Sequence, residues 1–189
     1  KLRKTQLALC LMFQYGGMSF VDFAHLNRGN IKNGILDYNR QKTGTSMRLE
    51  VLDTAEAMYK ELAGERAGGS GYLFPFLSGT KNGHEEYLEY NAALSRFNRN
   101  LKTLKEVAGI VSDVTSYTIR HSFAMSLKEQ NVPIEMISEL LGHKSIKTTQ
   151  IYLRSFSLEK MTVVNKSCFE NVYNYMPEVG CGYLGSSLK

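Results

Sequence analysis

The chain has 189 residues, of which 43% are hydrophobic and 22% charged, and its formal net charge is +5. These values are ordinary for a globular domain and exclude a largely disordered chain. The longest strongly apolar stretch, residues 7–13, is too short to cross a bilayer, and the excess of Lys and Arg favours polyanionic partners.

The cysteines indicate a reducing, cytoplasmic setting. Cys10, Cys168 and Cys181 are an odd number at no metal-ligand spacing. Cys10 lies in the apolar run, where we expect the thiol to pack as a small hydrophobe. The chain begins in a predicted helix, so we expect a fragment of a longer protein.

The first half of the chain predicts two helices and a hairpin. Residues 7–13 form a buried helix that Gly16 and Gly17 end, and residues 21–26 form a second, short helix. Residues 35–40 and 46–51 alternate as two strands, with Gly44 in the turn. Five basic residues lie in and just before this hairpin, against the single acid Asp37: Arg28, Lys32, Arg40, Lys42 and Arg48. They form either a basic patch for a polyanion or a solvated face.

The middle of the chain predicts two more helices. Residues 54–62 form one, followed by a glycine-rich surface loop over residues 63–71. Pro75 excludes residues 72–77 from a central strand. From Tyr87 to Leu104 an apolar stripe recurs at spacings of three and four, which predicts a long helix packed on the core.

The last third predicts short helices with clear boundaries. One helix carries Ile119 and Ala124 on one face, Pro133 opens a second that Gly142 closes, and Ser145 caps a third. We expect one more amphipathic helix between residues 155 and 173. The predicted fold is mainly α with a small antiparallel β-hairpin.

Three residues of this last third suit chemistry on a phosphodiester. The planar guanidinium of Arg120 can hold two phosphate oxygens, and the hydroxyl of Tyr152 can attack phosphorus. His143, nine residues before Tyr152, can hydrogen-bond the same phosphate. Each alone is better explained by packing or helix capping, and only the ordered set favours a catalytic site.

The motifs around these residues resemble those of the tyrosine recombinases, or phage integrases, and most closely the integrases of conjugative transposons. The matching stretches read TSYTIRHSFA (115–124), LLGH (140–143) and TTQIY (148–152). Residues 16–26 resemble the first box of that family, and residues 38–44 resemble the hairpin that bears its lysine.

The resemblance implies the fold of a tyrosine recombinase catalytic domain and a role for each matching residue. Tyr152 would form a 3′-phosphotyrosyl link, Arg120 would clamp the phosphate, His143 would hydrogen-bond it, and Lys42 would be the general acid. Neither a metal nor ATP nor another cofactor is implied. The resemblance also implies double-stranded DNA as partner, a homo-oligomer (a tetramer) on DNA, and no membrane.

Two positions depart from the family pattern. Tyr117 stands where the family has His or Lys, and Ser19 stands where it has a first arginine. Because residues two apart in a strand share a face, Arg40 would lie beside Lys42 and replace that arginine, with Arg28 as its competitor. Ser19 could itself donate one hydrogen bond to the phosphate. We expect Arg28, Lys144 and Lys147 to contact DNA.

Two other functions fit part of the pattern. Residues 133–153 also outline a helix-turn-helix, which would bind DNA without a nucleophile. A topoisomerase that nicks and reseals one strand would use nearly the same residues. We expect one catalytic domain over residues 1–189, in which residues 154–189 form a tail that docks on its own domain or on a neighbouring protomer.

Overall fold

The computed structural model describes residues 2–64, 71–153, 161–163 and 165–167, and for Tyr152 the backbone only. Contacts divide the chain into two units, Lys1–Leu153 and Arg154–Lys189. In the second unit residues 161–163 and 165–167 are helical. The rest of the C-terminal helix predicted there lies outside the described residues, as do residues 65–70 of the predicted loop. Within the described part, no helix is long and apolar enough to span a bilayer.

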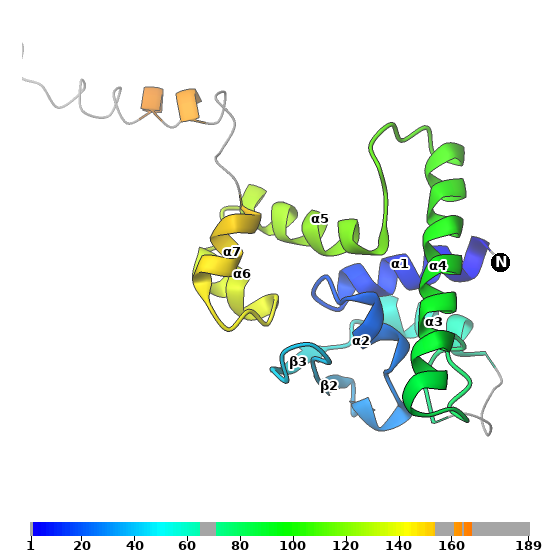
Figure 1. Ribbon diagram of the computed structural model, residues 1–189. Coiled ribbons are helices and arrows are strands. Elements are labelled where there is room, and N and C mark those ends of the chain that lie inside the picture. The colour runs from blue at the N-terminus through cyan, green and yellow to red at the C-terminus, as the bar shows by residue number, and fades with distance from the viewer. Residues whose placement is uncertain (1, 65–70, 154–160, 164, 168–189) are drawn as a thin grey trace, which may run out of the picture. The chain divides into compact units, whose positions relative to one another are not determined.

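The first unit is mainly helical, with one small sheet (Figure 1). Its helices are α1 (Leu2–Gln14), α2 (Phe20–Ala24), the 3₁₀ helix η1 (Arg28–Asn30), α3 (Asp53–Ala63), α4 (Gly83–Val107), α5 (Ser116–Glu129), α6 (Ile134–Leu140) and α7 (Ile146–Tyr152). Its strands are β1 (Ile31–Lys32), β2 (Ile35–Asn39) and β3 (Ser46–Glu50). The predicted fold class is confirmed.

The sheet is antiparallel in the order β1-β2-β3, with Tyr38 opposite Met47. The sequence predicted β2 and β3 but missed β1, since two residues are too few to show an alternation. Leu36, Tyr38 and Met47 share the buried face. After β2 the chain turns, and the carbonyl of Arg40 accepts a hydrogen bond from the Gly44 N–H at 2.8 Å.

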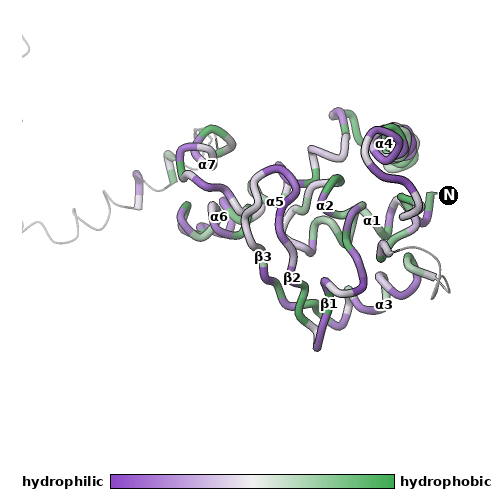
Figure 2. Tube along the Cα trace, turned by 60° about the horizontal axis from the view of Figure 1, so that its bottom comes forward, coloured by the Kyte–Doolittle hydropathy of each residue, from purple (hydrophilic) through white to green (hydrophobic). Residues whose placement is uncertain are grey.

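The main core surrounds α1, which contacts α3, α4 and α5. Figure 2 shows these elements with the hydropathy of each residue. The buried face of α1 carries Leu7, Ala8, Leu11 and Met12. Cys10 lies off this face and is exposed, so the prediction of a packed thiol was wrong.

The long helix α4 packs on the core through Phe97 and Leu101, as predicted. Tyr87, however, is 60% exposed. The segment before α4 packs on another side of its first turns, where Glu86 accepts from Tyr72 and Glu89 accepts from the Ser78 N–H. The apolar stripe therefore packs on the core except at Tyr87, its first residue.

A smaller apolar cluster joins α5, α6 and the turn that follows α6, through Ala124, Ile137 and Leu141. Gly142 ends this turn with a φ of +61°, the left-handed region that favours glycine. The Ser145 hydroxyl then accepts from the Lys147 N–H at 3.3 Å and caps α7. Both boundaries were predicted, and they hold His143 between two helices.

Candidate active site

Arg120 lies in the second turn of α5 and is 6% exposed. Its Nη1 donates to the carbonyl of Gly17 at 3.1 Å, and its Nη2 donates to the carbonyl of Leu141. A Cβ on Gly17 would lie 3.2 Å from Cα of Arg120, so a glycine keeps the first box close to α5. Arg120 thus joins the first box to the end of α6.

Arg40 reaches the same carbonyl from the hairpin. Its Nη1 donates to Leu141 O at 2.9 Å and to Gly142 O at 3.1 Å. Two guanidiniums therefore meet at one backbone oxygen. Burial, and then the charge of Arg40, lowers the pKa of Arg120 to about 10. Such a pair of buried cations favours an anion, because a bound anion offsets their mutual repulsion.

Arg40 and Lys42 do not share a face, contrary to the prediction. The same-face argument placed Arg40 and Lys42 together in a strand, but β2 ends at Asn39 and both residues lie in or beside the turn. Arg40 is buried whereas Lys42 is exposed. Arg40 continues the buried face of Leu36 and Tyr38, whereas the turn brings Lys42 to the surface.

Asp22 is the neighbour of Arg40 that the sequence analysis missed. Its carboxylate is 3.6 Å from Arg40 Nε, and it accepts from the Gln41 N–H at 2.7 Å and from the Ser19 hydroxyl at 2.6 Å. Asp22 therefore ties α2 to the hairpin turn beside Arg40. The signal was available, since Ser19 and Asp22 have the spacing of a capping box.

Ser19 is the N-cap of α2. Its side chain accepts from the Asp22 N–H and donates to the Asp22 carboxylate. Both hydrogen bonds are local to the helix terminus. The hydroxyl at the position of the missing arginine is therefore engaged in capping.

His143 follows Gly142 and is half-buried. Its Nδ1 lies 2.9 Å from the hydroxyl oxygen of Thr149 on α7. Burial, followed by the charges of Arg120 and Arg40, lowers the pKa of His143 to about 4. The imidazole is thus neutral at pH 7, and it lies near enough to both guanidiniums to feel their charges.

The other predicted site residues lie at the surface. Tyr117 is 61% exposed and precedes Arg120 by one turn of α5. Lys144 and Lys147 are exposed at the start of α7. Arg28 lies in η1 and lines a separate hollow with Tyr59, Lys60 and Leu73. Tyr152 is the last residue of α7, but its side chain lies outside the described residues.

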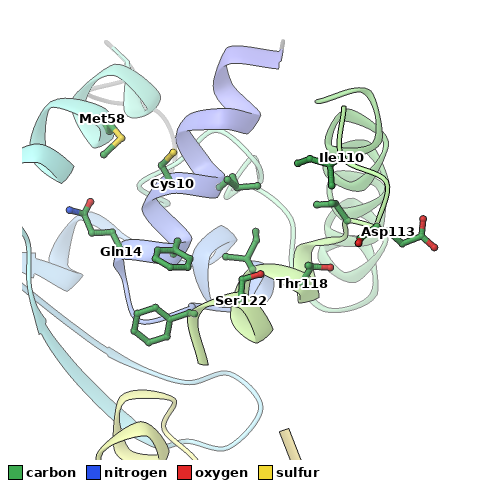
Figure 3. Close-up of a pocket in the computed structure, with 13 residues that line it drawn as sticks. Cys10, Gln14, Met58, Ile110, Asp113, Thr118 and Ser122 are labelled. Atoms are coloured by element: carbon green, nitrogen blue, oxygen red, sulfur yellow. The ribbon is translucent and has the colours of Figure 1, made fainter. Parts of the chain in front are cut away.

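A separate apolar groove of about 820 Å³ lies between α1, α3, α5 and the segment after α4. Figure 3 shows Cys10, Met58, Ile110 and Ser122 around it. Among the predicted site residues that the structure describes, none lines this groove. The arginine and histidine cluster is therefore the candidate active site.

Comparison with known proteins decides the family of this chain. The model of the phage integrase family matches residues 2–159. The chain belongs to the phage integrase family. The matched residues include the arginine and histidine cluster and Tyr152, so the predicted resemblance is confirmed.

Relatives and solved structures of the integrase family agree with this assignment. The chain is 42% identical over 69 residues to tyrosine recombinase XerD of Lacticaseibacillus casei, covering 36% of this chain and 24% of XerD. It is 33% identical over 120 residues to tyrosine recombinase XerC of Rickettsia prowazekii (strain Madrid E), covering 54% and 39%. The chain thus matches well under half the length of these two relatives.

Two DNA complexes share the fold. The Tn1549 transposon integrase, solved with a circular intermediate DNA, is 15% identical with a TM-score of 0.63, over 85% of this chain and 57% of that one. The XerH site-specific recombinase, bound to palindromic difH substrate, is 18% identical with a TM-score of 0.63, over 89% and 46%. At these identities the likeness shows the fold alone.

Proposed function

We propose that this chain is the catalytic domain of a tyrosine recombinase that cuts and rejoins double-stranded DNA through a 3′-phosphotyrosyl link on Tyr152. The observation that carries the proposal is the meeting of Arg40 and Arg120 at the carbonyl of Leu141, with His143 beside them. A scissile phosphate needs cations around its oxygens, and this cluster supplies them.

In this site Arg40 takes the role of the family's first arginine, whose position Ser19 occupies in this chain. Arg40 Nε faces the Asp22 carboxylate, whereas Nη2 makes no hydrogen bond within the described part of the chain, so the Nη2 N–H groups can donate to a phosphate. Asp22 holds the guanidinium through Nε. Ser19 caps α2 and has no part in the clamp. Arg28 loses its place as competitor because it lines another hollow.

The reaction is a transesterification. The Tyr152 hydroxyl releases its proton to solvent and its oxygen bonds to phosphorus as the bond to the 5′ oxygen breaks, and Lys42 donates a proton to that leaving oxygen. Arg40 and Arg120 stabilise the charge on the remaining phosphate oxygens, and His143 donates a hydrogen bond to one of them. Tyr117 has a hydroxyl one turn from Arg120 and offers a further contact. The phosphotyrosyl link conserves the energy of the broken bond for rejoining.

The wider setting follows from this substrate. Arg28, Lys144 and Lys147 contact the DNA backbone, which makes binding fall steeply with salt concentration. The recombinase acts as a homo-tetramer on two DNA duplexes, in the cytoplasm. Its most fitting source is a conjugative transposon, because the motifs of the chain resemble most closely the integrases of such elements.

A nicked DNA substrate tests the proposal. When cleavage releases a short strand end, rejoining fails and the protein stays covalently attached to the DNA. We expect such an adduct with the wild type and none with Tyr152→Phe, which keeps the ring and removes the nucleophile. Non-covalent binding without any adduct would favour the helix-turn-helix module. Resealing of the cut strand without transfer to a second duplex would favour the topoisomerase.

Two matched variants test the role of Arg40 as the second arginine that holds the phosphate. Arg40→Ala should lower the cleavage rate by at least a hundredfold, about 2.7 kcal/mol or more, as expected for one lost charge-stabilising donor. Arg28→Ala should weaken DNA binding and leave the cleavage rate of bound DNA unchanged. Equal cleavage rates in Arg40→Ala and the wild type would refute the role of Arg40.

A further inference from the structure

Thr149 is a buried polar residue beside the candidate active site. It lies in α7, three residues before Tyr152, and its exposure is 0%. Its hydroxyl oxygen is 2.9 Å from Nδ1 of His143. Thr148, the next residue in the same helix, is exposed. Two adjacent threonines thus have opposite environments, and only one contacts the histidine.

The direction of this hydrogen bond decides which nitrogen of His143 carries the proton. A neutral imidazole has one N–H donor and one bare nitrogen acceptor. Burial, and then the nearby guanidiniums of Arg120 and Arg40, disfavour a second proton, since an imidazolium would lose water and repel both cations. His143 therefore has to be one tautomer or the other.

Burial favours donation by the threonine. Within the part of the chain that the structure describes, His143 is the one hydrogen-bond partner of the Thr149 hydroxyl. If Nδ1–H donated to the hydroxyl, the hydroxyl proton would be buried without an acceptor. A buried donor without an acceptor loses its hydrogen bond to water and gains none, whereas an oxygen with spare lone pairs costs less. The hydroxyl therefore donates to a bare Nδ1.

We propose that Thr149 is a positioning residue, whose hydroxyl donates to Nδ1 of His143 and so fixes the proton on Nε2, where the imidazole can donate to a phosphate oxygen. Only the donation from Nε2 to a phosphate oxygen rests on the proposed function. The opposite tautomer would present the lone pair of Nε2, which repels a phosphate oxygen. Thr149 thus acts through His143 and does not touch the DNA.

The tautomer is measured directly by nitrogen NMR of the wild-type chain with ¹⁵N-labelled histidine. The signals of His143 are assigned by their absence in His143→Gln. We expect the Nε2–H pattern at neutral pH. The Nδ1–H pattern, or an imidazolium, would overturn the proposal. This measurement needs neither DNA nor activity, so it stands even if the chain fails to cleave DNA and the proposed function is lost.

Three variants test the consequence for cleavage. Thr149→Val keeps the branched shape and removes the hydroxyl, so we expect a mixture of tautomers and about a tenfold lower single-turnover cleavage rate, the size of one weakened hydrogen bond. Thr149→Ser should restore both, and Thr148→Val should change neither. If Thr149→Val kept the Nε2–H pattern, or changed it without slowing cleavage, the positioning role would be excluded.

Discussion

Replacing Gly142 with alanine tests the contact between the hairpin and the turn after α6. Gly142 has a φ of +61°, and a Cβ there would lie 2.5 Å from Met47 Sδ and 2.9 Å from Arg40 Cδ. Both side chains are buried, with exposures of 6% and 8%, so neither moves away freely. The added methyl group therefore strains the backbone and also displaces Arg40 from the carbonyls that it binds.

The two effects can be separated with a matched glycine. Gly109 has a φ of +66°, and a Cβ there meets nothing within 4 Å. Gly109→Ala should therefore show only the left-handed backbone cost of about 1–2 kcal/mol. Gly142→Ala should add about 1–3 kcal/mol of overpacking. Any effect of alanine on the unfolded chain is similar in both variants and cancels in the comparison.

Urea denaturation of both variants measures the difference in the free energy of unfolding. At a temperature where both variants are folded, Gly142→Ala should also cleave nicked DNA more slowly, whereas Gly109→Ala should cleave at the wild-type rate. Equal losses of stability in the two variants would refute the close approach of Arg40 and Met47 to Gly142.

Three further predictions concern the same cluster. Ser19→Ala removes the N-cap of α2, so it should lower the free energy of unfolding in urea by about 1 kcal/mol. It should leave the cleavage rate unchanged. A rate as low as that of Arg40→Ala would mean that the hydroxyl contacts the phosphate. Asp22→Asn removes the buried charge that faces Arg40 and accepts from Ser19 and Gln41, and should cost about 1.5–3 kcal/mol in the same assay; a cost near zero would contradict that arrangement. Burial, Arg120 and Arg40 lower the pKa of His143 in the folded protein to about 4, below the 6.5 of the unfolded chain. The unfolded chain therefore binds a proton between these values that the folded protein does not, so stability present above pH 6.5 is lost as the pH falls towards 4. His143→Gln should lose less stability than the wild type over that range, and equal losses would show that His143 is not the group responsible.

Local patterns were enough to predict most elements of the fold. Gly142 marked the end of α6 and Ser145 marked the start of α7, because a left-handed glycine and a capping serine act within one helical turn. The hairpin followed from alternation and from Gly44. By contrast, β1 has two residues and no period to detect, and the exposure of Tyr87 depends on where the segment before α4 packs.

The site was harder to predict because its contacts are long-range. Arg120 and His143 stood out in their motifs, but the sequence could not show that Arg40 reaches Leu141, one hundred and one residues away. Strand alternation holds for Arg40 but fails for Lys42, since the chain turns after β2 ends at Asn39. Asp22 and Thr149 were missed because a buried carboxylate and a buried hydroxyl gain their meaning from neighbours on other elements or across a turn.

The most direct test of the central claim is to identify the residue that links the protein to DNA. Wild-type protein is trapped on a nicked substrate, digested with protease, and the peptide that carries the nucleotide is sequenced by mass spectrometry. We expect one modified peptide, with a 3′-phosphate esterified to the phenolic oxygen of Tyr152. A link through another residue, such as Tyr117, or bound DNA with no covalent link, would contradict it.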